Sequence, residues 1–245
     1  MKMMCAKLLT IVTILFFVST VHATTFHVTT NIDSVDINIG NGECADSRGR
    51  CSLRAAIQES NASSGAFTIY LPVGEYELNL SGDEEDHEED DSIGDLDIRQ
   101  DIEIIGGGKD STFITASSSL NDRLFEIHLT SVHNVVFSGF TLSGGQADEG
   151  AAIYSDHANL RLSFVKIENN TAQESCGGLY INEGSASIES SVFNNNTTMD
   201  GGGGALCTFW ADELSITNSK FSNNSILNGY SYGGALRIIH TNTEI

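Results

Sequence analysis

The second half of the chain repeats short segments in which apolar and polar residues alternate. Such alternation over three to five residues is typical of strands that bury one face. The Asn that closes one of these segments recurs at Asn170, Asn196 and Asn224, so one repeat is about 26 residues long. Three kinds of element recur: Ile167–Asn170, Phe193–Asn196 and Phe221–Asn224; Cys176–Leu179, Gly203–Leu206 and Gly233–Leu236; Leu160–Leu162, Ser187–Ile188 and Ser215–Ile216. Three short strands and three turns per repeat predict one coil of a three-sided helix.

Stacking of these coils determines the predicted fold. One coil cannot bury its apolar side alone, whereas coils about 4.8 Å apart bury a continuous column and pair their backbone groups with the next coil. Parallel crossovers are nearly always right-handed. The repeats therefore predict an all-β fold, a right-handed single-stranded parallel β-helix. The paired glycines fit turns with positive φ or close backbone approach, and the recurring Asn fits an internal amide ladder and left-handed turns.

The alternation also gives each side chain of the most regular strand a direction. The residues expected to point inward are Leu179, Leu206 and Leu236, with Ile181, Thr208 and Ile238 two residues later. The residues between them, Tyr180, Cys207 and Arg237, are expected to point outward.

The first half of the chain is less regular. Short strands are indicated at Thr24–Thr30, Thr68–Leu71, Tyr76–Leu78, Asp95–Ile98, Ile102–Ile105, Leu124–Ile127 and Val135–Phe137. Ser52 suits the N-cap of a helix from Leu53 to about Glu59, with Leu53, Ala56 and Ile57 on one face. A solenoid end exposes apolar core, so we expect this helix to be a plug. We predict a cap over residues 24–66 and the β-helix over residues 67–245, with an acidic insertion at 83–91.

The first 23 residues have the pattern of a secretory signal peptide. Lys2 and Lys7 precede or flank the apolar stretch Leu8–Val18, and Val21–Ala23 supplies the pattern for cleavage after Ala23. A membrane-spanning helix needs about 20 apolar residues, and no later stretch of the sequence is that long and apolar. We therefore expect residues 1–23 to be removed and the remaining chain to be exported.

Four cysteines follow this segment, and export permits disulfides. Cys44 and Cys51 flank a short polar loop, which favours a local disulfide over two free thiols. For Cys176 and Cys207, the expected offset along a straight strand is roughly 12 Å, beyond disulfide reach. A sharp turn at Gly177–Gly178 would shorten that offset, so the pairing of these two cysteines stays open.

The formal net charge of −21 narrows the classes of partner. Phosphate binding needs clustered Lys and Arg, so nucleic acid is not expected as a partner. Anionic membranes and polyanionic substrates are disfavoured for the same electrostatic reason. Cations, neutral glycans and basic protein surfaces remain open.

One segment concentrates negative charge. Eight of the nine residues in Asp83–Asp91 are acidic. Blocks of like charge usually form a solvated, self-repelling loop. Carboxylate oxygens also suit Ca²⁺, although the segment lacks the spaced ligands and central Gly of an EF-hand loop. The candidate calcium ligands are Asp83, Glu84, Glu85, Asp86, Asp90 and Asp91.

Catalysis on a β-helix would need a carboxylate pair or a calcium site beside a basic residue, on the outer face of neighbouring coils. The outward positions of the regular coils hold no carboxylate pair, and the histidines after residue 23 form no obvious ligand set. Asp95, Asp97 and Arg99 fall on one side of a predicted strand, which we interpret as a solvated strand face. No catalytic residue is therefore assigned.

The outer face offers a binding hypothesis instead. Tyr180, Phe209 and Ile239, with Trp210 at the strand end, are candidates for an exposed apolar strip. Such strips often mark contact with a protein partner or a glycan. The alternative is that a loop covers these side chains.

Two groups of motifs resemble known families. Cys51–Ile57 closely resembles the CSLREA motif of secreted bacterial β-helix proteins, with Ala55 where that motif has Glu. Leu71–Tyr76 and Gly94–Ile98 resemble segments that accompany the motif. The Gly-Gly-Ala-Leu and Phe-x-x-Asn tetrads resemble the repeats of chlamydial polymorphic outer membrane proteins. Together the matches are spread over most of residues 44–236.

The resemblance implies a pectin-lyase-like β-helix at the cell outer membrane or beyond it, without implying one activity. Polymorphic outer membrane proteins end in a membrane β-barrel, whereas this sequence stops at Ile245, inside a predicted coil. We expect either a truncated product or a last coil that is capped in another way.

These observations favour an exported, non-catalytic, monomeric β-helix that presents an outer face to a glycan or protein ligand, as an adhesin does. The alternative is a polysaccharide lyase or glycoside hydrolase on the same fold. A third possibility is a fragment of a longer passenger domain.

Overall fold

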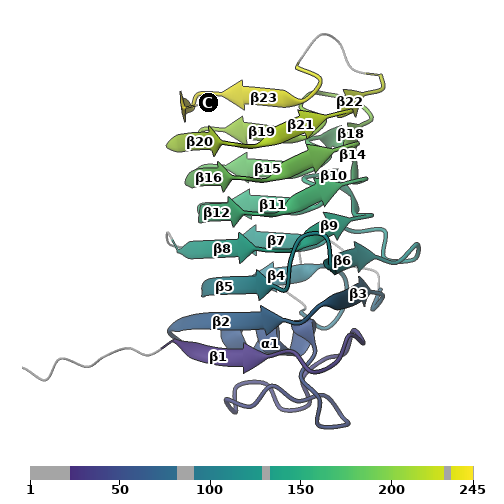
Figure 1. The fold of residues 1–245 in the computed structure, drawn as a ribbon, viewed down its shortest axis with the longest axis vertical. Helices are drawn as coiled ribbons and strands as arrows, with labels where there is room; N and C mark the ends of the chain where they lie inside the picture. Colours follow the sequence, from purple (N-terminus) through teal and green to yellow (C-terminus); the bar gives the residue numbers. More distant parts are fainter. Residues whose placement is uncertain (1–22, 82–90, 129–132, 229–232, 245) are drawn as a thin grey trace, which may run out of the picture.

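The computed structural model describes residues 23–81, 91–128, 133–228 and 233–244. The chain winds into a right-handed parallel β-helix, and successive coils stack along the long axis (Figure 1). The predicted fold class is therefore confirmed.

Four parallel sheets make up the helix, named here sheets A to D. Sheet A contains β1 (Thr24–His27), β2 (Ala66–Leu71), β5 (Asp101–Gly106), β8 (Asn134–Ser138), β12 (Asn159–Ser163), β16 (Ser185–Glu189), β20 (Glu213–Thr217) and β24 (Asn242–Glu244). Sheet B contains β3 (Gly74–Leu78), β6 (Thr112–Ala116), β9 (Thr141–Ser143), β13 (Lys166–Glu168), β17 (Val192–Asn194) and β21 (Lys220–Ser222).

The other two sheets complete each coil. Sheet C contains β4 (Leu96–Ile98), β7 (Phe125–His128), β11 (Ile153–Asp156), β15 (Leu179–Asn182), β19 (Leu206–Phe209) and β23 (Leu236–Ile239). Sheet D contains β10 (Gln146–Glu149), β14 (Thr171–Ser175), β18 (Thr197–Thr198) and β22 (Ser225–Ile226). Three strands per coil were expected. Sheet D is the difference, because its polar strands pair with one another where the sequence indicated only a turn.

The inward columns of sheet C form the core as expected. Leu179 pairs with Leu206 in the next coil, and Leu206 with Leu236. Leu179, Leu206 and the neighbouring Ile181 are fully buried, whereas Leu236, in the last coil, is half-buried. Stacking of equivalent apolar residues in successive coils thus fills the interior.

The internal amide ladder and the left-handed turn were both expected at the same Asn of each repeat, but two adjacent residues share these roles. Asn170 Nδ2 donates to Asn196 Oδ1 at 3.0 Å, and Asn196 Nδ2 donates to Asn224 Oδ1 at 3.0 Å. This buried amide ladder confirms the predicted one. The residues just before, including Asn169 and Asn195, have φ of 58° and 56° and turn the chain.

Glycine allows close stacking at the turn before β15. A methyl group on Gly178 would lie 2.5 Å from the carbonyl oxygen of Ala205 in the next coil. Any larger residue at this position would push the two coils apart, so the close approach explains this glycine of the repeat.

The helix α1 (Leu53–Asn61) lies at the β1–β2 end of the β-helix (Figure 1). Ser52 is its N-cap, because the Ser52 hydroxyl accepts from the Ala55 N–H at 3.0 Å. Leu53, Ala56 and Ile57 pack into the core from the expected face. The role of α1 as a plug stays a prediction.

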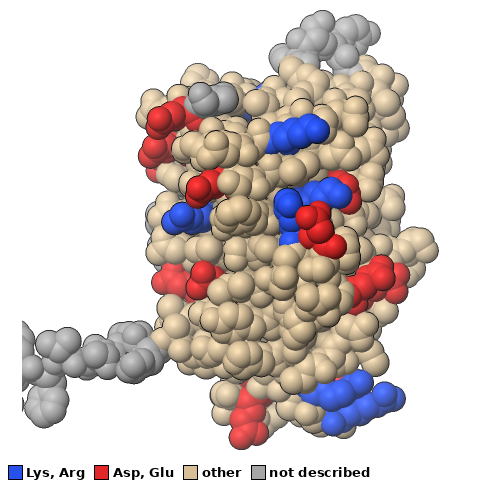
Figure 2. All heavy atoms as spheres, viewed as in Figure 1, with Lys and Arg blue, Asp and Glu red and all other residues tan. Residues whose placement is uncertain are grey.

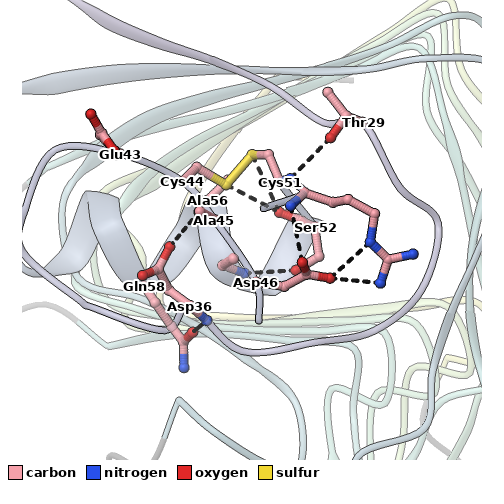
Figure 3. The surroundings of a disulfide bond; sticks show 12 residues. Thr29, Asp36, Glu43, Cys44, Ala45, Asp46, Cys51, Ser52, Ala56 and Gln58 are labelled. Atoms are coloured by element: carbon pink, nitrogen blue, oxygen red, sulfur yellow. Dashed lines mark hydrogen bonds and ion pairs between the residues drawn. A yellow bond between two sulfur atoms is a disulfide. The ribbon is translucent and has the colours of Figure 1, made fainter. Parts of the chain in front are cut away.

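The disulfide between Cys44 and Cys51 has a Cα–Cα distance of 5.0 Å and closes the loop that leads into α1 (Figure 3). Asp46 organises this loop, since its carboxylate accepts from Arg50 Nη2 at 2.7 Å and from the backbone N–H groups of Arg48 and Arg50. The hydrogen bond from the Arg50 side chain is the main reason that the pKa of Asp46 lies well below its usual range. The loop is therefore held by the Asp46–Arg50 ion pair as well as by the disulfide.

Within residues 23–81, 91–128, 133–228 and 233–244, no helix combines the length and the hydropathy that a membrane span requires.

Candidate binding face on sheet C

The outward side chains of sheet C form one column that changes character along the helix. Strand pairing aligns Asp97 with Glu126, Glu126 with Tyr154, Tyr154 with Tyr180, Tyr180 with Cys207 and Cys207 with Arg237. The column thus runs from carboxylates through aromatic rings to a cysteine and an arginine. We call this surface the sheet C face.

The middle of the sheet C face is an aromatic ladder. The rings of Tyr154 and Tyr180 stack with centroids 5.0 Å apart, and those of Tyr180 and Phe209 stack at 5.2 Å. Guanidinium groups cover both ends, since Arg123 lies 5.0 Å from the Tyr154 ring centroid and Arg237 lies 4.9 Å from that of Phe209. Offset rings and cation–π pairs of this kind stabilise a surface by about 1 kcal/mol each.

The apolar strip that was expected to be exposed is mostly buried or half-buried in the structure. Tyr180 does point away from the helix interior, but only 9% of it is exposed. It belongs to a second, small apolar cluster with Cys176 and Cys207, outside the main core. Phe209 and Ile239 are half-buried. Trp210 is the candidate that remains exposed, at 61%.

The sequence left open whether Cys176 and Cys207 pair. In the structure they form a disulfide with a Cα–Cα distance of 5.4 Å. Cys176 has a φ of 61°, so the chain turns sharply at this residue. The straight-strand offset of roughly 12 Å therefore does not apply. The disulfide links two neighbouring coils across the sheet C face.

The tyrosines of the ladder cannot serve as bases. Burial raises the pKa of Tyr154 to about 12, with the negative charge of Asp156 as the next cause. Burial also raises the pKa of Tyr180. Both hydroxyls therefore stay protonated at physiological pH.

The turn that follows each sheet C strand carries a second ladder. His157, Glu183, Trp210 and His240 occupy equivalent positions in successive coils, with φ of 58°, 56°, 55° and 51°. His157 Nε2 lies 2.8 Å from Glu183 Oε2, and the Trp210 ring stacks on that of His240 at 4.0 Å between centroids. The indole is thus held on a rigid backbone at the edge of the sheet C face.

The other end of the sheet C face holds a buried charge cluster. Arg123 Nη1 lies 2.6 Å from Glu126 Oε2, and Arg123 Nε lies 3.6 Å from Asp95 Oδ2. Only 4% of Asp95 is exposed. Burial, followed by the charges of Asp122 and Asp97, raises the pKa of Asp95 well above its usual value. Burial is also the main cause that raises the pKa of Asp122.

A carboxyl pair lies beside this cluster. Burial raises the pKa of Asp97 to about 8, and a side-chain hydrogen bond to the neighbouring carboxylate of Asp91, which stabilises the protonated form of Asp97, contributes next. Arg99 Nη2 lies 2.8 Å from Asp91 Oδ1 and 3.3 Å from Asp97 Oδ2, and Asn61 Nδ2 donates to Asp91 Oδ2 at 3.1 Å. A carboxyl with a pKa raised in this way, beside a second carboxyl, is capable of acid–base chemistry.

This arrangement corrects the interpretation of Asp95 and Asp97 as part of a solvated strand face. Sequence reasoning also missed Asp122, Arg123 and Glu126, which come from the next coil. The available signal was the strand register, because Glu126 lies one coil beyond Asp97. It was missed because the early coils are irregular and their register was not assigned.

The candidate calcium ligands lie only in part within the described residues. Asp83, Glu84, Glu85, Asp86 and Asp90 lie outside the described residues. The sixth candidate, Asp91, is engaged by Arg99 and Asn61. In the part of the chain that the structure describes, no group of three or more His, Cys, Asp or Glu side chains is placed to hold a metal ion. The calcium site therefore stays a prediction.

Comparison with known proteins yields one family. Residues 190–208 match the Chlamydia polymorphic membrane protein repeat. The match covers β17, the Asn196 position of the amide ladder, β18 and most of β19. Comparison with curated proteins and with solved structures gives no match. The chain is therefore similar, over part of one coil, to the repeat of these membrane proteins.

Proposed function

We propose that the protein is exported and acts, at the cell outer membrane or outside the cell, as a non-catalytic β-helix that binds a ligand on its outer face, as an adhesin does. Three observations support export and a surface location. These are the secretory-signal pattern of residues 1–23, the disulfides Cys44–Cys51 and Cys176–Cys207, and the similarity to a membrane protein repeat.

The exposed Trp210 is the single observation that carries the binding role. Trp is enriched at the interface positions where binding energy concentrates. Its backbone is fixed, because the Trp210 N–H donates to the Ile239 carbonyl at 3.1 Å and its ring stacks on His240. A rigid anchor loses little conformational entropy on binding, which favours affinity.

Retention on surfaces tests this function. Purified protein is passed over intact cells, extracellular matrix proteins and neutral polysaccharides, with and without Ca²⁺, and both retention and bond cleavage are recorded. We expect retention without cleavage. Absence of retention on every surface, or cleavage that a chelator abolishes, would contradict the proposal.

A second candidate function rests on the Asp91–Asp97 carboxyl pair. A carboxyl with a pKa of about 8 is protonated at neutral pH and able to donate a proton, as a glycoside hydrolase or polysaccharide lyase requires. Arg99 and Asn61, however, engage both oxygens of Asp91. This internal pairing favours a structural role, so the enzyme remains the second candidate.

A further inference from the structure

We infer that the hollow beside Trp210 binds a cationic side chain, specifically an arginine, of a protein partner. This inference rests on the proposed function, because it names the partner for the same outer face. It depends on three features of the described residues: an open aromatic ring, a hollow lined by acceptors, and a charge that complements a cation.

The aromatic ring is open on one side. The Trp210 indole lies almost parallel to the His240 ring, at 7° and 4.0 Å between centroids. One face of the indole is therefore covered, yet 61% of the residue is still exposed. The second face is thus accessible to a ligand.

A hollow of about 210 Å³ begins two residues after Trp210 and two residues after His240. It lies where the turn enters β20 and its partner strand β24. The residues that line it are Asp212, Glu213, Asn242, Thr243 and Glu244. Figure 2 shows acidic side chains gathered at the upper left of the view, at the height of β20 in Figure 1.

The lining presents acceptors to a ligand. Asp212, Glu213 and Glu244 contribute carboxylates, which accept hydrogen bonds and carry negative charge. Asn242 Nδ2 donates one hydrogen bond to the Asp212 carbonyl at 3.1 Å, and Thr243 Oγ1 donates to the Thr241 carbonyl. The three carboxylates match a ligand that supplies donors, and an arginine guanidinium has five N–H groups.

The neighbouring sheet C face already holds guanidinium groups over aromatic rings. Arg123 lies over the Tyr154 ring and Arg237 over the Phe209 ring. Trp is the aromatic residue that attracts cations most strongly. The open face of Trp210, two residues before the acidic lining begins at Asp212, offers the same chemistry to a group from outside. The chain's net charge of −21 adds a long-range attraction for a basic partner.

Trp210 is the single tryptophan of the sequence, so its fluorescence reports on this site alone. Purified protein is titrated with acetylated and amidated tetra-arginine. The matched probe is tetra-citrulline, which keeps the shape but lacks the charge and replaces one nitrogen of each guanidinium by a carbonyl oxygen. A neutral oligosaccharide, maltoheptaose, is the third probe. We expect a saturable change in Trp210 emission with tetra-arginine, weakened by added salt, and none with the other two probes.

Variants identify the groups responsible. The double substitution Asp212→Asn with Glu213→Gln is expected to weaken tetra-arginine binding about fivefold, because it removes two exposed negative charges. Trp210→Ala, followed by calorimetry, is expected to weaken it to a similar extent. Phe164→Ala is the control, since Phe164 is also exposed with a φ of 54° but lies at another turn. Circular dichroism confirms that each variant is folded.

Several results would overturn the inference. These are no emission change with tetra-arginine at millimolar concentration, equal binding of tetra-citrulline, or a response to maltoheptaose alone. Retention on cell surfaces without tetra-arginine binding would refute this inference and leave the proposed function standing. Tetra-arginine binding without retention on any surface would support the arginine site and refute the proposed function.

Discussion

Arg54 provides the sharpest test of how the N-terminal region is held to the β-helix. Only 1% of Arg54 is exposed, although a helix residue with its charge normally faces water. It donates to the Asp33 carboxylate at 2.8 Å and 3.2 Å, and to the carbonyl oxygens of Gly94 and Asp95 at 2.7 Å and 2.9 Å. This one side chain therefore ties α1 both to the preceding loop and to the start of β4.

The substitution Arg54→Met keeps the apolar stem and removes the charge. Removal of one partner from a buried ion pair costs roughly 3–5 kcal/mol, because the other charge stays buried. The Asp33 carboxylate still accepts the N–H groups of Asn79 and Leu80 at 2.9 Å and 3.1 Å. These bonds place the expected loss at the lower end, about 3 kcal/mol. Arg48→Met, at an exposed position of the same loop, is the control.

Hydrogen exchange read by mass spectrometry measures this loss region by region. Coils of a solenoid contact only their neighbours, so the effect of Arg54→Met is expected in α1 and its adjoining loop and not in β15–β20. A loss of about 3 kcal/mol corresponds to about 100-fold faster exchange where exchange follows stability. The additional change Asp33→Asn is expected to restore part of the loss. An acceleration below threefold, or one equal to that of Arg48→Met, would refute the reasoning.

Three further perturbations test the ladder, the second disulfide and the buried carboxyls. Asn196→Ala is expected to lower the free energy of unfolding, measured in urea, by about 2–4 kcal/mol, because it leaves buried amide groups of the ladder unsatisfied. The control Asn195→Gly, in the adjacent exposed turn, should lower it by under about 1 kcal/mol. Equal losses would contradict the ladder's role. Replacement of both Cys176 and Cys207 by Ser should cost roughly 3–4 kcal/mol, as expected for a loop of 31 residues, and an unchanged urea midpoint would contradict this. The raised pKa of Asp97 means that the folded state binds more protons than the unfolded state between pH 3.8 and about 8, so stability should fall as pH rises through this window. Asp97→Asn should flatten that fall, and an unchanged pH profile would show that Asp97 does not titrate as described.

The regular coils could be predicted from sequence because each position recurs. Leu179, Leu206 and Leu236 share one place in the repeat, and so do Asn170, Asn196 and Asn224. Each copy supports the register of the others, since a slip would move every apolar side chain to the outside. Ser52 was found equally directly, because an N-cap depends on local sequence.

The candidate site could be predicted only in part, for two physical reasons. Trp210 was identified because it follows a regular strand. The burial of Tyr180 depends on the left-handed turn at Cys176, a conformation that its sequence does not indicate. The burial of Asp95 depends on Arg123, which comes from the next coil through an irregular connection. Ion pairs between distant segments leave no periodic trace in the sequence.

The central claim is that the outer face binds and does not cleave. The most direct test incubates a retained polysaccharide or protein with the wild type and with Asp97→Asn, and measures new chain ends by mass spectrometry. The account predicts equal retention and no new ends with either protein, because Asp97 is a structural carboxyl. New ends that appear with the wild type and disappear with Asp97→Asn would contradict it and establish the carboxyl pair as a catalytic site.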